Sequence, residues 1–286
     1  MTNYLITGAT GGYGSAVIRE LSKSVPKENI IALVRSKEKG AALSEAGYPI
    51  RIADFNQTDA LAEAVHGIDK VLLVSTDATP TRQQEHKNVI QAATDANVKF
   101  IAYTSLAQAD SVAANFPLGD DHRATEQALA QSGIAYTSLR NNWYLENELD
   151  YITNSLKTGK FINTTPENSV AGWVSRDDLA EAGANILLAD NPPAIVELSG
   201  KNRSYQDIVE ALNEALDTNI INVFDSQEVL ANALEKDGMP SEVASLVASF
   251  QGAVGAGFLK AESSDLESIL GRPQTSLVDS LKKLLG

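Results

Sequence analysis

A short apolar run that breaks into glycines near the start of the chain constrains its fold most. Residues 4–6 are Tyr-Leu-Ile, and glycines follow at positions 8, 11, 12 and 14, before a segment with apolar residues at helical spacing. This order indicates a buried strand, a tight turn and a helix. Such a turn lets the backbone approach a diphosphate, and the helix N-terminus attracts its charge. We therefore expect a nucleotide cofactor to contact Gly8, Ala9, Thr10, Gly11, Gly12 and Tyr13.

The first hundred residues repeat this strand and helix alternation. The spacing Gly8-x-x-Gly11-x-x-Gly14 differs from the more frequent G-x-G-x-x-G and is weak evidence alone, so the wider pattern matters. A continuous aliphatic run such as Ile30–Val34 is typical of a strand buried on both faces of a parallel sheet. The pattern predicts an α/β fold with a Rossmann-type, doubly wound parallel sheet. Its strands are expected at 4–6, 30–34, 49–53, 70–74 and 99–104, with helices at 13–24, 38–46, 59–65 and 83–96.

The second half of the chain is less regular. We expect a loop over 108–121, a helix over 122–131 and a sixth strand over 134–139. Further helices are expected over 147–156, from 177, and over 204–216, 226–236, 241–250 and 275–285, with a hairpin or short strands around Phe161 and 170–174. Ser175 with Asp178 and Ser204 with Asp207 resemble capping boxes. The predicted domains are a Rossmann domain over 1–150, its sheet completed by a strand near 195–199, and a smaller C-terminal α/β lobe, mainly helical, over 151–286.

Composition excludes several classes of function. Hydrophobic residues make up 43% and charged residues 21% of the 286, as in ordinary globular proteins. A formal charge of −14 argues against nucleic acid, and no apolar stretch is long enough to predict membrane insertion. There is no cysteine, and the three histidines are not at metal-ligand spacing, so we expect no metal. The first residues show no secretion signal, which predicts a cytoplasmic protein. The sequence leaves an oligomer open.

A basic residue follows the second predicted strand. Folds that prefer NAD place an acidic residue there to bind the ribose hydroxyls, whereas this chain has Arg35, with Lys37 and Lys39 close behind. A guanidinium matches a 2′-phosphate, so we expect NADPH to be favoured over NADH. The alternative is a solvated basic loop at a helix start.

Small polar residues follow the third and fourth strands. Asp54 can accept a hydrogen bond from an adenine amino group and Phe55 can flank the base, although Asp54 can equally be a helix cap. After the fourth strand, Ser75, Thr76 and Asp77 form a polar turn that lets a cofactor ribose run close to the backbone. The carboxyl ends of such strands are where ligands bind.

Ser105 follows the fifth strand, and with this residue the chain resembles a known family. The motif Thr-Gly-x-x-Gly-x-x-Gly, Asp54 and Ser105 together are similar to the short-chain dehydrogenases/reductases. The stretches 100–105, 139–147 and 270–273 resemble the atypical NmrA-like branch, and within it the bacterial NAD(P)H:quinone oxidoreductases. The resemblance covers nearly the whole chain. It implies an NADPH site that also includes Ser105, Asn141, Asn142, Trp143, Tyr144, Trp173, Val174 and Ser175.

The chain departs from that family at the proton donor. Standard members carry Tyr-x-x-x-Lys on the helix after the fifth strand, and no tyrosine here has a lysine four residues later. The corresponding helix offers His122-x-x-x-Glu126, which is either a weak proton donor or a surface cap and ion pair. Tyr144 is the other catalytic candidate. The rings of Trp143 and Tyr144 either line a pocket for a flat substrate or are core aromatics.

These features favour an NADPH-dependent oxidoreductase that reduces a small planar, quinone-like substrate by direct hydride transfer. Reduced quinone oxygens are phenolic, with a pKa near ~10, so the reaction needs less acid catalysis than ketone reduction. Two alternatives remain open. One is an NmrA-like redox sensor that binds the dinucleotide without catalysis, and the other is a reductase of another planar substrate.

Overall fold

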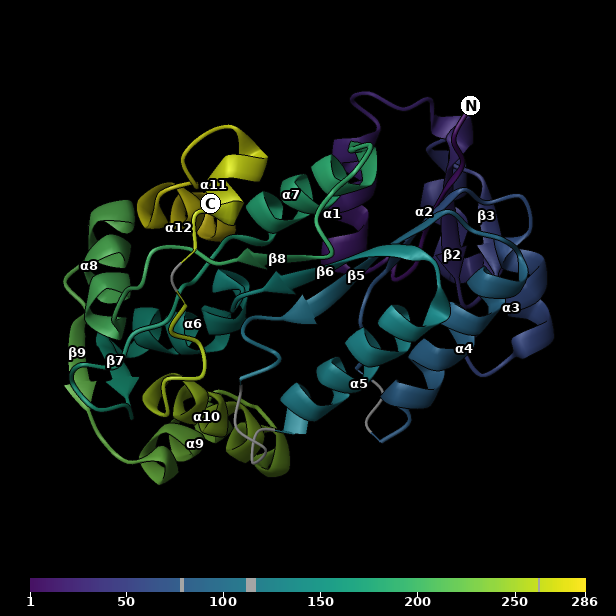
Figure 1. The fold of residues 1–286 in the computed structure, drawn as a ribbon. Helices are drawn as coiled ribbons and strands as arrows, with labels where there is room; N and C mark the ends of the chain where they lie inside the picture. The colour runs from purple at the N-terminus through teal and green to yellow at the C-terminus, as the bar shows by residue number, and fades with distance from the viewer. Residues whose placement is uncertain (78–79, 112–116, 262) are drawn as a thin grey trace. The chain divides into compact units, whose positions relative to one another are not determined.

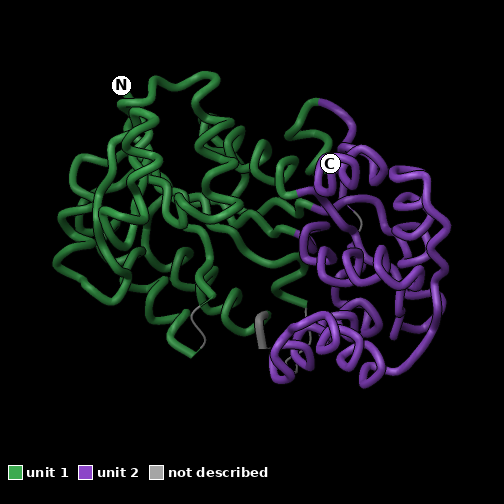
Figure 2. Tube along the Cα trace, turned by 180° about the vertical axis from the view of Figure 1, so that it is seen from behind, with its two compact units in different colours: residues 1–141, 176–198, 265–271 green, residues 142–175, 199–264, 272–286 purple. Residues whose placement is uncertain are grey.

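The computed structural model describes residues 1–77, 80–111, 117–261 and 263–286, which form two compact units (Figures 1 and 2). Unit 1 comprises residues 1–141, 176–198 and 265–271, and unit 2 comprises 142–175, 199–264 and 272–286. This division differs from the expected boundary at residue 150. Two segments from the second half of the chain belong to unit 1, because one supplies the last strand of its sheet and the other packs beside that strand.

Unit 1 contains a seven-stranded sheet in the order β3-β2-β1-β4-β5-β6-β8. All of its strand pairs are parallel. The strands are β1 (Tyr4–Ile6), β2 (Ile30–Val34), β3 (Ile50–Ile52), β4 (Lys70–Leu73), β5 (Phe100–Leu106), β6 (Ala135–Asn141) and β8 (Ile195–Leu198). This order confirms the doubly wound fold. The strand numbers fall from β3 to β1 and then rise from β4, and such sheets bind their ligands at the point where the order switches, here between β1 and β4.

Helices cover both faces of this sheet (Figure 1). They are α1 (Gly12–Leu21), α2 (Lys37–Glu45), α3 (Thr58–Val65), α4 (Arg82–Asp95), α5 (Pro117–Ser132), α7 (Arg176–Leu188) and α11 (Asp265–Leu270), with a 3₁₀ turn η1 (Lys27–Asn29). Helices α3, α4 and α5 pack side by side, and α1 packs against α7.

Helix α5 corrects the expectation of a loop up to residue 121 and a helix from residue 122. It already begins at Pro117, because proline is favoured in a first helical turn, where its missing N–H has no partner to lose. Residues 112–116 of the expected loop lie outside the described residues. The short helix α11 was not expected, and the Asp265 carboxylate at its start accepts a hydrogen bond from the Glu197 backbone N–H of β8 at 2.9 Å.

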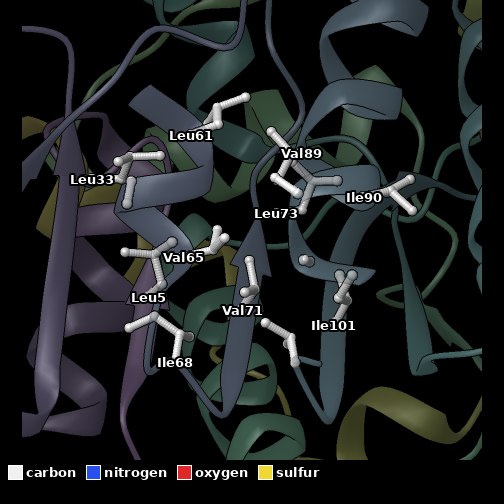
Figure 3. Close-up of a cluster of buried hydrophobic side chains, with 14 of the residues drawn as sticks. Leu5, Leu33, Leu61, Val65, Ile68, Val71, Leu73, Val89, Ile90 and Ile101 are labelled. Atoms are coloured by element: carbon white, nitrogen blue, oxygen red, sulfur yellow. The ribbon is translucent and has the colours of Figure 1, made fainter. Parts of the chain in front are cut away.

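One face of the sheet holds a hydrophobic cluster (Figure 3). Alternate strand residues such as Leu5, Val71 and Ile101 point into it, and Leu61 and Val89 meet them from α3 and α4. Each fully buried side chain of this kind stabilises the fold by roughly 1.5–3 kcal/mol relative to exposure. Because successive strand residues point to opposite faces, a continuous apolar run gives both faces of the sheet apolar side chains against which helices can pack.

Unit 2 is mainly helical, with a small second sheet. Its elements are η2 (Leu145–Glu148), α6 (Leu149–Thr158), β7 (Lys160–Asn163), α8 (Tyr205–Leu216), β9 (Ile221–Phe224), α9 (Gln227–Lys236), α10 (Ser241–Gly255) and α12 (Leu277–Leu285). Of the two alternatives expected around Phe161, the short strand is present as β7, whereas the hairpin is wrong, because β7 pairs in parallel with the distant β9. Ser204 and Asp207 form the expected capping box at α8. Within the described ranges, no helix has the length and apolar character needed to cross a bilayer.

Candidate cofactor site

The turn between β1 and α1 has the backbone geometry of a diphosphate cradle. Gly8 has a φ of +57°, which side chains rarely adopt, and the Gly11 N–H donates to the Gly8 carbonyl at 2.9 Å. A Cβ on Gly14 would lie 2.3 Å from the Gly8 oxygen, so only glycine lets the helix approach the strand so closely. The turn also lies against the end of β4, since a Cβ on Gly8 would lie 3.0 Å from the Val74 Cβ.

The N-terminus of α1 suits an anion. Gly11 caps the helix without a side-chain hydrogen bond, and the first turn contains no acidic residue. The helix therefore offers backbone N–H groups and its positive dipole end to a ligand. Arg176, at the start of α7, places its guanidinium beside this turn, because a Cβ on Gly12 would lie 2.6 Å from its Nη1. Arg176 adds a cation that the sequence reasoning did not include among the site residues.

Not every residue of the turn presents its side chain. Thr10, Gly11 and Gly12 are exposed, whereas Ala9 and Tyr13 are buried. The Tyr13 hydroxyl donates to the Leu179 carbonyl of α7 at 3.1 Å. The Tyr13 side chain therefore joins α1 to α7.

Arg35 is the first residue after β2, and its side chain is exposed. Ser36 is the N-cap of α2 and accepts a hydrogen bond from the Lys39 N–H at 3.3 Å. Lys37 and Lys39 are also exposed. The end of β2 thus carries three cations at the edge where a parallel sheet binds a nucleotide.

Asp54 shapes the loop after β3. Its Oδ1 accepts hydrogen bonds from the Asn56 backbone N–H at 2.9 Å and from Asn56 Nδ2 at 3.2 Å. The N-cap of α3 is Gln57, so Asp54 closes a turn before the helix and does not cap it. Phe55 is partly buried and packs against the hydrophobic cluster, and its carbonyl accepts from Asn88 Nδ2 at 2.8 Å.

Side chains from neighbouring elements hold the turn after β4. Thr7 Oγ1, after β1, accepts from the Val74 N–H at 2.8 Å, and Thr104 Oγ1 of β5 accepts from the Ser75 N–H at 2.8 Å. The Thr76 N–H donates to His86 Nε2 at 3.1 Å. Ser75 and Thr76 are half-buried and Asp77 is exposed. Threonines at the ends of adjacent parallel strands were the available sequence signal for this arrangement, and the sequence reasoning missed it.

His122 is a buried residue of α5. Its Nδ1 lies 2.8 Å from the hydroxyl of Tyr103, which is fully buried in β5. Burial lowers the pKa of His122 to about 3, helped by the charge of Arg82, and burial raises the pKa of Tyr103 above its usual range. The alternative of a surface cap and ion pair is therefore wrong. His122 is a neutral imidazole at physiological pH, which cannot donate a proton as an imidazolium.

Glu126 does not pair with His122 and instead organises a second network. Its Oε1 accepts from the Ser105 hydroxyl at 2.6 Å and from Arg140 Nε at 3.0 Å, and its Oε2 accepts from Arg140 Nη2 at 2.8 Å. Arg140 also donates to Glu197 Oε1 at 3.0 Å. Burial alone would lower the pKa of Arg140, but its hydrogen bonds to Glu126 and Glu197 raise it overall. Because Ser105 donates to a carboxylate, its hydroxyl proton is already engaged.

The stretch after β6 crosses from unit 1 to unit 2. Asn141 is buried at the end of β6, and its carbonyl accepts from the Ala107 N–H at 3.0 Å. In unit 2, Asn142 Nδ2 donates to Ser199 Oγ at 2.8 Å and to the Leu259 carbonyl at 3.0 Å, and Asn142 Oδ1 accepts from the Trp143 N–H at 2.7 Å. The Asn142 side chain therefore joins the segment after β6 to the segments that contain Ser199 and Leu259.

Aromatic residues of unit 2 divide into buried and accessible ones. Trp173 is 1% exposed and its indole donates to Glu148 Oε1 at 2.9 Å, so its ring belongs to the core of the unit. Trp143 and Tyr144 are half-buried, as is Ser175, while Val174 is buried. The ring of Trp143 packs edge-on against Phe250 at 5.7 Å between centroids. Tyr144 is therefore more accessible to a substrate than Trp173.

Comparison with known proteins places this arrangement in a family. A family described as NAD(P)H-binding matches residues 8–190. Quinone oxidoreductase 2 of Escherichia coli (strain K12) is 37% identical over 282 residues, 98% of this chain and 97% of that protein. Two solved structures each have a TM-score of 0.90, and each match covers 99% of this chain and 100% of the chain in that structure. They are the E. coli NADPH-dependent quinone oxidoreductase QOR2 complexed with NADPH, at 36% identity, and Citrobacter sp. triphenylmethane reductase complexed with NADP(H), at 31%. The resemblance noted from the motifs is confirmed: the chain belongs to the NAD(P)H-binding, NmrA-like family of oxidoreductases with a Rossmann fold.

Proposed function

We propose that this protein is an NADPH-dependent quinone reductase that transfers a hydride directly from cofactor to substrate. The observation that carries the proposal is the similarity to E. coli quinone oxidoreductase 2, which extends at 37% identity over 98% of the chain. A match of this extent covers nearly all of both units.

The residues around the glycine turn fit a dinucleotide phosphate. The turn between Gly8 and Gly14 and the start of α1, which has no side-chain cap, would hold the diphosphate, with Arg176 as a neighbouring cation. Arg35 would bind the 2′-phosphate, because its exposed guanidinium stands where an NAD-preferring fold has a carboxylate. When bound, NADPH supplies a hydride, which with one proton from water converts a quinone to a hydroquinone and leaves NADP⁺.

Of the described residues considered as proton donors, Ser105 and His122 offer little acid catalysis. The Ser105 hydroxyl donates to Glu126, and His122 is neutral and bonded to Tyr103. A quinone tolerates this because its reduced oxygen is a weakly basic phenolate, with a pKa near ~10, which water can protonate. Reduction of an unactivated ketone would instead form an alkoxide that needs a placed donor.

The similarity to Citrobacter triphenylmethane reductase favours a second candidate substrate class, cationic triarylmethane dyes. Such a cation accepts a hydride at its central carbon and becomes a neutral product without any proton. The same residues would therefore serve both substrate classes, and the two share a flat, delocalised electron acceptor.

The test is to mix the purified protein with NADPH and a panel of benzoquinones and naphthoquinones, and to follow the loss of nicotinamide absorbance. Parallel reactions contain a triarylmethane dye, an aliphatic ketone or no acceptor. We expect turnover with quinones and none with the ketone. Bound NADPH without turnover on any quinone or dye would contradict the proposal and leave the redox sensor, whereas turnover of the dye alone would favour the second candidate.

A further inference from the structure

Glu148 is a buried carboxyl with an incomplete set of hydrogen bonds. It is the last residue of η2 in unit 2 and is 0% exposed. Its Oε1 accepts from Trp173 Nε1 at 2.9 Å, and its Oε2 has no hydrogen-bond partner among the described residues. No described arginine, lysine or histidine forms an ion pair with it. A buried carboxyl without an ion-pair partner is costly to ionise.

Among the described residues, those around Glu148 are aromatic, and no positively charged side chain contributes to its pKa shift. The Trp173 ring packs edge-on against Tyr205 of α8 at 5.1 Å, and Tyr205 in turn packs against Phe161 of β7 at 5.4 Å. The titratable groups that face Glu148 are the phenols of Tyr205 and of Tyr151 on α6, with the Asp150 carboxylate beside the latter. Burial raises the pKa of Glu148 to about 7, although the Trp173, Tyr205 and Trp143 side chains act to lower it. None of these titratable neighbours is a cation, so the hydrogen-bond donors only partly offset the cost of burying a carboxylate.

Glu148 and Trp173 join two segments of unit 2 that also pair through their backbones. Tyr144 and Val174 form a parallel bridge, the Leu145 N–H donates to the Val174 carbonyl at 2.9 Å, and the Val174 N–H donates to the Trp143 carbonyl at 3.1 Å. The pairing is only this long, because η2 begins at Leu145. The Glu148–Trp173 hydrogen bond adds a side-chain contact between the two segments.

Both segments carry residues of the proposed cofactor and substrate site. Trp143 and Tyr144 lie on one, and Val174 and Ser175 lie on the other. We propose that Glu148 is a positioning residue, which through its hydrogen bond to Trp173 holds these two segments in the conformation that binds NADPH. This inference rests on the proposed function, because it takes the two segments as part of the cofactor site.

Protonation of Glu148 then controls how well the segments are held. The neutral carboxyl fits the buried aromatic setting, whereas the ionised carboxylate favours conformations in which water reaches it and the Trp173 contact loosens. Since the binding conformation prefers the neutral form, NADPH affinity should fall as pH rises through about 7. A shift of one pKa unit between free and bound protein corresponds to about a tenfold change in affinity.

The first measurement follows the hydrogen bond itself in the ligand-free protein. The chain has two tryptophans, Trp143 and Trp173, so intrinsic fluorescence and near-ultraviolet circular dichroism report on this site. We expect a titration with a midpoint near 7 that is absent in Glu148→Gln, whose amide oxygen can still accept from Trp173. The control Asp150→Asn removes an exposed neighbouring carboxylate and should keep the titration. A titration unchanged in Glu148→Gln would overturn the assignment.

The second measurement is the NADPH dissociation constant at about pH 6 and about pH 8.5. Because the ligand's own phosphate also titrates, the readout is the difference between wild type and Glu148→Gln. We expect the wild-type affinity to fall about tenfold more than that of the variant. Equal profiles for both proteins would contradict a positioning role.

The outcomes separate this inference from the proposed function. NADPH binding that never occurs at any pH would refute the proposed function, while the tryptophan titration would still report the Glu148–Trp173 contact. A missing titration would refute the inference even if quinone turnover is found. If Glu148→Gln fails to fold, infrared spectra of the wild type across the same pH range serve instead, with the buried carboxylic acid band expected to disappear near neutral pH, and its absence at low pH contradicting the assignment.

Discussion

At the scale of single residues, Arg35 and His122 lie in contrasting surroundings. Arg35 is exposed at the end of β2, where a carboxylate would favour NADH. His122 is buried against Tyr103 and neutral. The position of Arg35 could be predicted from the sequence, because it depends only on where β2 ends. The burial of His122 could not, because it depends on the register of α5 against β5.

Replacement of Arg35 by alanine tests its role at the 2′-phosphate. A charge-assisted hydrogen bond of this kind contributes about 1.5–3 kcal/mol, so Arg35→Ala should weaken NADPH binding roughly ten- to a hundredfold and leave NADH nearly unchanged. Isothermal titration calorimetry with NADPH and with NADH measures the two affinities. Lys99→Ala is the control, because Lys99 lies at the opposite, amino end of β5. Equal weakening of both cofactors would show that Arg35 does not bind the 2′-phosphate.

Replacement of His122 by alanine separates structure from catalysis. We expect kcat for quinone reduction to stay within a few-fold, because the imidazole is neutral and its Nδ1 is engaged by Tyr103. Stability should fall by about 1–3 kcal/mol, because the buried Tyr103 hydroxyl loses its partner. Steady-state kinetics and urea unfolding report the two effects. A loss of activity of a hundredfold or more in a folded variant would make His122 the proton donor.

At the scale of elements, the glycine turn and the strand ends define the candidate site. Continuous apolar runs were sufficient to predict the strands of the main sheet and their doubly wound order. Three features escaped prediction because they depend on distant contacts. These are the pairing of β7 with β9, the short helix α11 beside β8, and the network that joins Ser105, Glu126 and Arg140.

The closeness of α1 to β1 provides a test of the turn. Gly14→Ala would place a Cβ 2.3 Å from the Gly8 carbonyl oxygen, so the backbone must move. We expect NADPH binding to be lost and stability to fall by about 1–3 kcal/mol. Gly252→Ala in α10 is the matched control, because its Cβ would meet nothing within 4 Å and alanine favours helix by about 1 kcal/mol. Unchanged NADPH binding by Gly14→Ala would mean that the turn does not hold the diphosphate.

For the whole molecule, Glu148 predicts a pH dependence of stability. Its pKa is about 7 in the folded protein and near 4.5 without burial. The stabilisation is therefore fully present below about 4.5 and is lost as pH rises through about 7, by up to roughly 3 kcal/mol. Urea unfolding should show this loss in wild type, and Glu148→Gln should show a flatter profile. Parallel profiles would indicate that Glu148 is solvated in the folded protein.

The central claim is that the protein binds NADPH and itself passes the hydride to a quinone. A single-turnover reaction tests it most directly: the NADPH complex is mixed with one equivalent of benzoquinone, and cofactor oxidation and hydroquinone are both quantified. Direct transfer predicts one hydroquinone per NADPH oxidised, and slower oxidation when the transferred hydrogen of NADPH is deuterium. NADPH that remains bound and reduced, or that is oxidised no faster than in the protein-free control, would contradict the account.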